Sequence, residues 1–199
     1  MKTLLTLLAA LPWLAQAQTA TLSEAEAKAR LSHAPERTAA TGVSDQGADR
    51  AFVPAKEASR SYDLERNLVI VKKTDGSTEK RPLLDLPVLF VKGTADLLDA
   101  QSRQNLRTLS NTIRDLHTGG GARFVIEGHT SAEGDTAVNQ ALSVQRARAI
   151  QSQLALLLGE DAAACLTPQG FGPAHARSPA SAPESALQLD RRVLIVRSR

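Results

Sequence analysis

The sequence predicts an α/β fold, a two-layer sandwich of helices on a small sheet, preceded by a mostly disordered extension. Three observations predict it. Apolar, β-branched runs alternate with two long segments in which leucine and isoleucine recur at helical spacing. Glycines follow both segments, as they do at helix C-termini. Residues 18–60 have few large apolar side chains, so this stretch cannot offset the entropy lost on ordering.

The first 17 residues have the pattern of a secretion signal. Lys2 precedes an apolar run over residues 4–14, and Ala15-Gln16-Ala17 is a small-x-small cleavage site, so we expect the mature chain to begin at Gln18. The run is shorter than the roughly 20 residues of a membrane-spanning helix, and no later run reaches that length. We therefore expect a periplasmic protein with no transmembrane segment in the mature chain. A lipoprotein anchor is not expected, because the single cysteine is Cys165.

Between the signal and the first core strand we expect two segments. Residues 18–60 should be a flexible tether, with one short helix capped by Ser23. Residues 61–87 should form a short β-hairpin or linker: a strand at 68–71, a turn at Asp75-Gly76 and a returning strand near 81–84.

A domain over residues 88–199 should follow. Its first half is a core strand at 88–91, an amphipathic helix from Asp99 to His117 ended by three glycines, and a strand at 123–127. Residues 128–136 read as a polar loop.

The second half begins with a helix over residues 138–158 that Gly159 ends. We expect this helix to turn the following side chains inward: Leu142, Ile150, Leu154 and Leu157. Short strands at 166–170 and 192–197 complete the sheet. Cys165, next to an apolar strand, is expected to be a buried thiol, with a reactive thiol as the alternative.

Composition excludes some functions. The 24 basic and 21 acidic residues give a net charge of +3, too even a balance to indicate nucleic-acid binding. A wall hydrolase would need paired carboxylates, a metal-bound water or a Cys/His pair, and we find no such set, so we expect no enzyme and no cofactor. His129 with Glu127 and Glu133 lacks zinc-ligand spacing, so we expect no metal and a packing or hydrogen-bonding role for His129.

Four motifs from Val88 onward resemble one family. They are Phe90-Val91-Lys92-Gly93-Thr94-Ala95, Ile126-Glu127-Gly128-His129-Thr130, the helix start Asn139 to Ala147 (NQALSVQRA), and Gly170-Phe171-Gly172 followed by Arg191-Arg192-Val193. In this order and spacing they resemble the OmpA-like C-terminal domain of outer-membrane porins, peptidoglycan-associated lipoproteins and flagellar stator subunits. The resemblance implies a βαβαββ domain that binds peptidoglycan in the cell envelope, in association with the outer membrane.

The resemblance also implies a site. The family binds the diaminopimelate side chain of the stem peptide, which presents carboxylates and an ammonium. Arg146 occupies the position of the arginine that grips a carboxylate with two parallel hydrogen bonds. Ser131 stands where the family's aspartate takes the ammonium, so the pocket should be weaker or tuned differently. Glu133 and Asp135 are candidates to replace the lost charge.

The resemblance to the family also assigns site roles to five further positions. Asn139 matches a residue that contacts the peptide, although its position also suits a helix N-cap. Arg191 matches a second cation, Gly93 and Thr94 the loop that closes the pocket, and Thr130 a donor through its amide or hydroxyl. Asp190 replaces the family's asparagine and is a candidate partner for an arginine, whereas Arg146 without its motif would read as a surface cation.

The sequence therefore leaves two functional hypotheses. The first is non-covalent binding of diaminopimelate-type peptidoglycan, which anchors or links the envelope. The alternative is a protein-interaction module of the same fold that binds envelope proteins and, having Ser131 for aspartate, has lost wall binding.

Overall fold

The computed structural model describes residues 19–39 and 57–199. The expected signal peptide and residues 40–56 of the expected tether lie outside these ranges. The elements are, in order, α1 (Glu24–Leu31), β1 (Glu36–Thr38), β2 (Glu57–Asp63), β3 (Leu68–Lys73), β4 (Thr78–Leu86), α2 (Ala100–Gly120), β5 (Phe124–His129), α3 (Thr136–Leu158), α4 (Glu160–Ala163), β6 (Leu166–Gly172), α5 (Glu184–Asp190) and β7 (Val193–Arg197).

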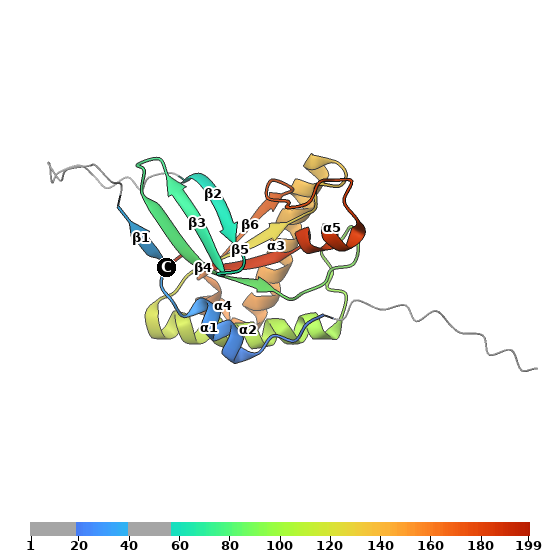
Figure 1. Ribbon diagram of the computed structural model, residues 1–199. Helices are drawn as coiled ribbons and strands as arrows, with labels where there is room; N and C mark the ends of the chain where they lie inside the picture. Colours follow the sequence, from blue (N-terminus) through green and yellow to red (C-terminus); the bar gives the residue numbers. More distant parts are fainter. Residues whose placement is uncertain (1–18, 40–56) are drawn as a thin grey trace, which may run out of the picture.

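One mixed sheet organises the described residues, with the order β2-β3-β4-β7-β5-β6 and β1 paired to β4. β5 and β6 are parallel and joined through α3, while the other pairs are antiparallel. Figure 1 shows α1 and α2 side by side along one face of this sheet. The order β4-α2-β5-α3-β6-β7 confirms the predicted α/β class and its βαβαββ core.

The first strand of that core is not where the sequence placed it. Residues 88–91, expected as a core strand, form only an isolated bridge between Phe90 and Leu97. The strand is β4, whose residues 83–86 pair with β7. Proline has no N–H to continue a ladder, so β4 ends before Pro87. Val88 of the following segment is still buried in the core, and Val88, Leu89 and Phe90 line a cavity.

The core lies mainly between the helices and the sheet. α2 contributes Leu106, Leu109 and Ile113, and α3 contributes Ala147, Ile150 and Leu154. The main core cluster comprises Leu22, Ala27, Leu31, Leu84, Leu86, Val88, Leu106, Leu109, Ile113, Ala122, Phe124, Ile126, Ala147, Ile150, Leu154, Cys165, Leu166, Val193 and Ile195. A smaller cluster of Val69, Val71, Leu83, Leu194 and Val196 covers the opposite face, so the sheet is apolar on both sides.

The N-terminal segment is part of the fold, which corrects the expected tether for its described residues. Ser23 caps α1 as predicted, accepting a hydrogen bond from Glu26 N. Leu22, Ala27 and Leu31 are nevertheless buried in the main core, because α1 packs on α2. The few apolar residues of this stretch are spaced to face one way, a weak signal beside its polar composition.

Side-chain amide and guanidinium groups fix this segment at both ends. Asn105 of α2 accepts from Leu22 N at 2.9 Å and donates to Ala20 O and Pro87 O at 2.8 and 2.7 Å. Thr19 Oγ1 hydrogen-bonds to the carboxylate of Asp99. Arg197 of β7 donates to Leu31 O at 3.0 Å. The start and the end of α1 are therefore both tied to the domain.

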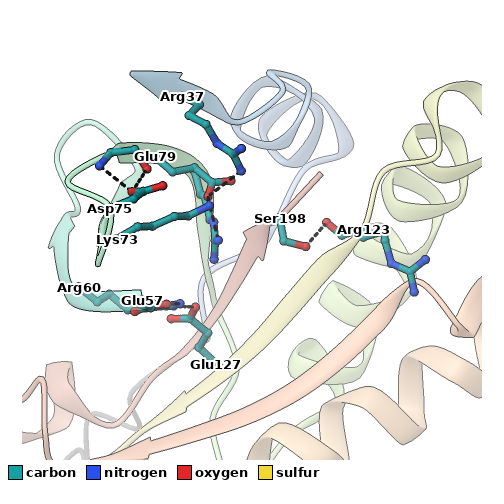
Figure 2. A network of polar contacts seen from close by, with 11 residues as sticks. Arg37, Glu57, Arg60, Lys73, Asp75, Glu79, Arg123, Glu127 and Ser198 are labelled. Carbon is teal, nitrogen blue, oxygen red and sulfur yellow. Dashed lines mark hydrogen bonds and ion pairs between the residues drawn. The ribbon is translucent and has the colours of Figure 1, made fainter. Parts of the chain in front are cut away.

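The predicted hairpin is confirmed as β3 and β4, with its turn at Asp75-Gly76, and β2 adds a strand that the sequence did not indicate. The sheet curls enough to bring β2 over β5, although three strands separate them in the sheet order. Arg60 of β2 forms an ion pair with Glu127 of β5 (Figure 2). Tyr62 Oη also donates to Glu127, at 2.8 Å. Because Glu127 is fully buried, this pairing satisfies a charge that would otherwise be costly.

The two main helices match their predictions closely. Asp99 caps α2, and Gly121 ends it in the left-handed conformation at φ 63°. α3 begins two residues early, and Asp135, not Asn139, is its N-cap. Leu157, expected to face inward, is 37% exposed. No helix in the described part of the chain is both long and apolar enough to span a membrane.

The C-terminal part differs from expectation in one element. The stretch between β6 and β7, for which the sequence predicts no element, contains the short helix α5. Cys165 is 1% exposed, and burial raises the pKa of its thiol, so the buried-thiol prediction is confirmed.

Candidate ligand pocket

A cavity of about 1050 Å³ opens between α3, α5 and the segment that follows β4. The structure brings five of the predicted site residues to it: Gly93, Ser131, Asn139, Arg146 and Arg191. The remaining lining residues are Val88, Leu89, Phe90, Lys92, Leu98, Asp99, Glu133, Gly134, Val138, Ala141, Leu142, Gln145, Glu184 and Gln188. Thr94 and Thr130 do not line it.

Arg146 is the buried cation of this cavity. It is 4% exposed, its Nε donates to Thr94 O at 3.0 Å, and its guanidinium carbon lies 4.9 Å from the centre of the Phe90 ring. No carboxylate of the described residues lies within ion-pair distance of it. Burial, helped by the charge of Arg191, lowers the pKa of Arg146 to about 10. The surface-cation reading of Arg146 is therefore wrong.

Asn139 shapes the loop that forms one wall. Its side-chain amide donates to Glu133 O at 2.7 Å and to Ser131 O at 3.4 Å, so it holds the loop against the first turn of α3. Ser131 is 4% exposed, and among the described residues its hydroxyl makes no hydrogen bond. Asn139 thus positions Ser131 at the cavity through these two hydrogen bonds to the loop.

The two loop carboxylates expected as substitutes for the missing charge lie differently. Asp135 accepts from Val138 N at 2.9 Å as the cap of α3 and does not line the cavity. Glu133 lines the cavity but is exposed. Of the two, only Glu133 is placed to meet a ligand.

Arg191 reaches the cavity from the end of α5. Its guanidinium forms an ion pair with Glu184, at the start of the same helix. Asp190 does not pair with Arg191: it is fully buried and accepts from Arg177 N and Ser178 N at 2.9 and 3.0 Å. Burial alone would raise the pKa of Asp190, but these amides and the charge of Arg177 lower it. The expected pairing of Asp190 with an arginine holds for Arg177.

The two predicted threonines lie outside the cavity lining and make contacts within the protein. The carbonyl of Thr94 fixes Arg146, and Gly93 precedes it at φ 77°, in the left-handed region that favours glycine. The amide of Thr130 donates to Gly172 O at 3.0 Å, so it is not free to donate to a ligand. The buried Thr130 hydroxyl has no partner among the described residues.

Other motif residues pack α3 onto the sheet. A Cβ added at Gly128 would lie 2.1 Å from Ser143 O, and one at Gly170 would lie 2.5 Å from Ser143 Oγ. Ser143 Oγ in turn accepts from Gly172 N at 2.9 Å. The glycines and the serine of the motifs thus set how closely α3 packs against β5 and β6, and therefore how deeply Arg146 is buried.

His129 belongs to an aromatic cluster on the other face of the sheet. Its ring stacks on Phe171 at 5.5 Å between centroids and meets the edge of Tyr62 at 5.3 Å. Within the described residues no group of three His, Cys, Asp or Glu side chains is placed to hold a metal ion. The packing role predicted for His129 is confirmed.

Sequence reasoning missed the apolar part of the cavity and Glu184. Leu98, Val138 and Leu142 line it, with Leu98 56% and Val138 64% exposed. Leu142 was expected to face inward from its helical spacing, and no periodicity distinguishes a cavity wall from a core. Glu184 lies in a stretch rich in Pro, Ala and Ser that gave no sign of α5.

Several solved structures are similar to this chain. The peptidoglycan-associated lipoprotein from Burkholderia pseudomallei is 23% identical, with a TM-score of 0.48 over 56% of this chain and 88% of that one. The periplasmic domain of Helicobacter pylori MotB is 14% identical, with a TM-score of 0.49 over 60% and 81%. The OmpA-like domain of FopA1 from Francisella tularensis is 16% identical, with a TM-score of 0.44 over 82% and 94%.

No curated protein sequence matches the chain. The model of the OmpA family matches residues 89–188, which is half of the chain and includes the loop at Ser131, the helix that carries Arg146 and the first part of α5. The protein belongs to the OmpA family.

Proposed function

We propose that the cavity binds the diaminopimelate branch of a peptidoglycan stem peptide without covalent bonds, and so holds the protein to the cell wall in the periplasm. The observation that carries this proposal is the buried, unpaired guanidinium of Arg146. Membership of the OmpA family supports it, since the resemblance implies wall binding through this arginine.

A buried cation without a counter-ion is costly, and proteins usually pair it. Here the Nε of Arg146 is held by Thr94 O, which leaves the two terminal nitrogens to face the cavity that the side chain lines. That fork matches a carboxylate through two parallel hydrogen bonds. A ligand carboxylate would supply the missing charge, so binding would relieve a cost already present in the free protein.

Arg191 gives the same cavity a second positive charge at its rim. Its pairing with the exposed Glu184 keeps it in place beside the cavity. A ligand with a second carboxylate, as diaminopimelate peptides have, can exchange with Glu184 for this arginine at little cost, because exposed ion pairs contribute only about 0–1 kcal/mol.

We also propose that the protein binds the wall without cleaving it. Incubation with sacculi should therefore release no soluble muropeptides. Chromatography of the supernatant measures this directly, and release above the buffer control would point to an enzyme.

The test of binding is sedimentation of residues 18–199 with purified diaminopimelate-type sacculi at low salt. We expect the wild type to pellet and Arg146→Ala to remain in the supernatant. Arg148→Ala is the matched control: it removes an exposed arginine two residues along the same helix and should pellet like the wild type. Circular dichroism checks that both variants fold.

Two results would count against wall binding. A folded wild type that stays in the supernatant would exclude it and favour the interaction module with an envelope protein as partner. Equal losses for Arg146→Ala and Arg148→Ala would mean that general positive charge, and not the cavity, holds the protein on sacculi.

A further inference from the structure

We infer that the cavity is selective for the acylated form of the wall branch, in which a carboxylate stands beside a secondary amide, as at a peptide cross-link. The uncross-linked branch presents the same carboxylate beside a free ammonium. This inference rests on the proposed function and adds the state of the amine that the site selects.

The first argument is the charge that the cavity leaves free. Arg146 is buried and has no ion-pair partner among the described residues, so a ligand carboxylate can pair with it. The acidic lining residues offer no buried free carboxylate for an ammonium: Asp99 caps α2, and Glu184 pairs with Arg191. Glu133 is exposed on the loop, where a carboxylate is solvated and screened. An ammonium brought into the cavity would lose water and gain no buried counter-ion.

The second argument is the group that stands at the buried wall. Ser131 lines the cavity, is 4% exposed, and presents a hydroxyl that no described residue engages. A hydroxyl donates one hydrogen bond and can accept up to two, so it can pair with both the N–H and the C=O of an amide. An ammonium has three donors and a full charge, and a single neutral acceptor leaves most of that demand unmet. Ser131 therefore suits the amide.

The third argument is the apolar lining next to these groups. Val138 and Leu98 are 64% and 56% exposed, and Leu142 and Phe90 line the same cavity. A free ammonium ends the ligand in a charge and covers none of this surface. An acyl arm that carries an alanine methyl would remove part of it from water, which favours the acylated ligand.

The test compares two probes that differ at one nitrogen. The first is a purified disaccharide-tetrapeptide monomer with a free diaminopimelate side-chain amine. The second is the same monomer after acylation of that amine with N-acetyl-D-alanine. Isothermal titration calorimetry on residues 18–199 should show the wild type binding the acylated probe about tenfold more tightly, since a factor of ten corresponds to about 1.4 kcal/mol, within reach of one unmet charged hydrogen bond.

Two variants assign the preference. Ser131→Asp supplies a buried carboxylate and should reverse it toward the free amine, whereas Arg146→Ala should weaken both probes. Thermal melting of Ser131→Asp checks its fold, and the wild-type comparison decides the inference even if that variant does not fold.

The outcomes separate the two proposals. If the wild type binds the free-amine probe equally well or better while Arg146→Ala loses binding, wall binding stands and the selectivity for the acylated form is wrong. If folded wild type binds neither the probes nor sacculi, the proposed function itself fails.

Discussion

Replacing Gly128 by alanine should test how tightly α3 is seated on β5. The added Cβ would lie 2.1 Å from the carbonyl oxygen of Ser143, where ordinary contact begins at 3.4 Å. The obstacle is backbone, so no side-chain rotation relieves it, and α3 must move by about 1.3 Å or the strand must deform. Overpacking usually costs about 1–3 kcal/mol, and a backbone clash belongs at the upper end, so we expect about 3 kcal/mol.

Thermal unfolding followed by far-UV circular dichroism suits this test, because the single tryptophan is Trp13, in the expected signal. At about 2–4 °C per kcal/mol for a chain of this size, Gly128→Ala should lower Tm by about 6–12 °C. Gly119→Ala is the matched control, because its Cβ meets nothing within 4 Å and helical alanine is favoured over glycine. That variant should be neutral or slightly stabilised. A loss of less than about 1 kcal/mol for Gly128→Ala would refute this account of the packing.

Three further results are expected. Leu31→Ala should cost about 2–5 kcal/mol in urea unfolding, because Leu31 is fully buried although it lies in the polar N-terminal segment; an unchanged midpoint would mean that α1 is not docked. Arg60→Ala should cost about 3–5 kcal/mol by leaving Glu127 buried without its cation, and a double-mutant cycle with Glu127→Ala should recover part of that loss. Burial lowers the pKa of His129, so its contribution to the free energy of unfolding should be full above the unfolded pKa of about 6.5 and should fall as the pH drops below that value. His129→Phe should flatten this fall in stability between about pH 7.5 and 5.5. An unchanged slope of stability against pH would contradict this prediction.

The βαβαββ core was predictable because its periodicities are strong. The two long helices carry regular apolar stripes and end at glycines, and the boundaries of α2 follow from Asp99 and Gly121. β2 could not be predicted in the same way. Its sequence is polar, and it is held by Arg60 and Tyr62 meeting Glu127, a contact between residues 65 and more positions apart. No local pattern reports such a pairing.

The candidate site was predicted through motifs and only in part through chemistry. Arg146 follows from its motif, but its burial without a counter-ion needs the whole fold, since Thr94 and Phe90 come from a distant segment. The motifs also overstated Thr130, whose amide is used by the adjacent chain at Gly172. A sequence motif contains residues that bind a ligand and residues that pack the fold, and the sequence alone does not tell the two apart.

The attachment of the N-terminal segment has a mechanical consequence. Thr19 contacts Asp99, which also lines the cavity, and the carboxamide of Asn105 joins Ala20, Leu22 and Pro87. A pull on the chain at Thr19 therefore enters the domain through the first turns of α2, next to the cavity that Asp99 lines. The first bond to carry tension is that of Thr19 with Asp99, followed by those of the Asn105 carboxamide, so these two contacts set the load at which the N-terminal segment peels from the domain.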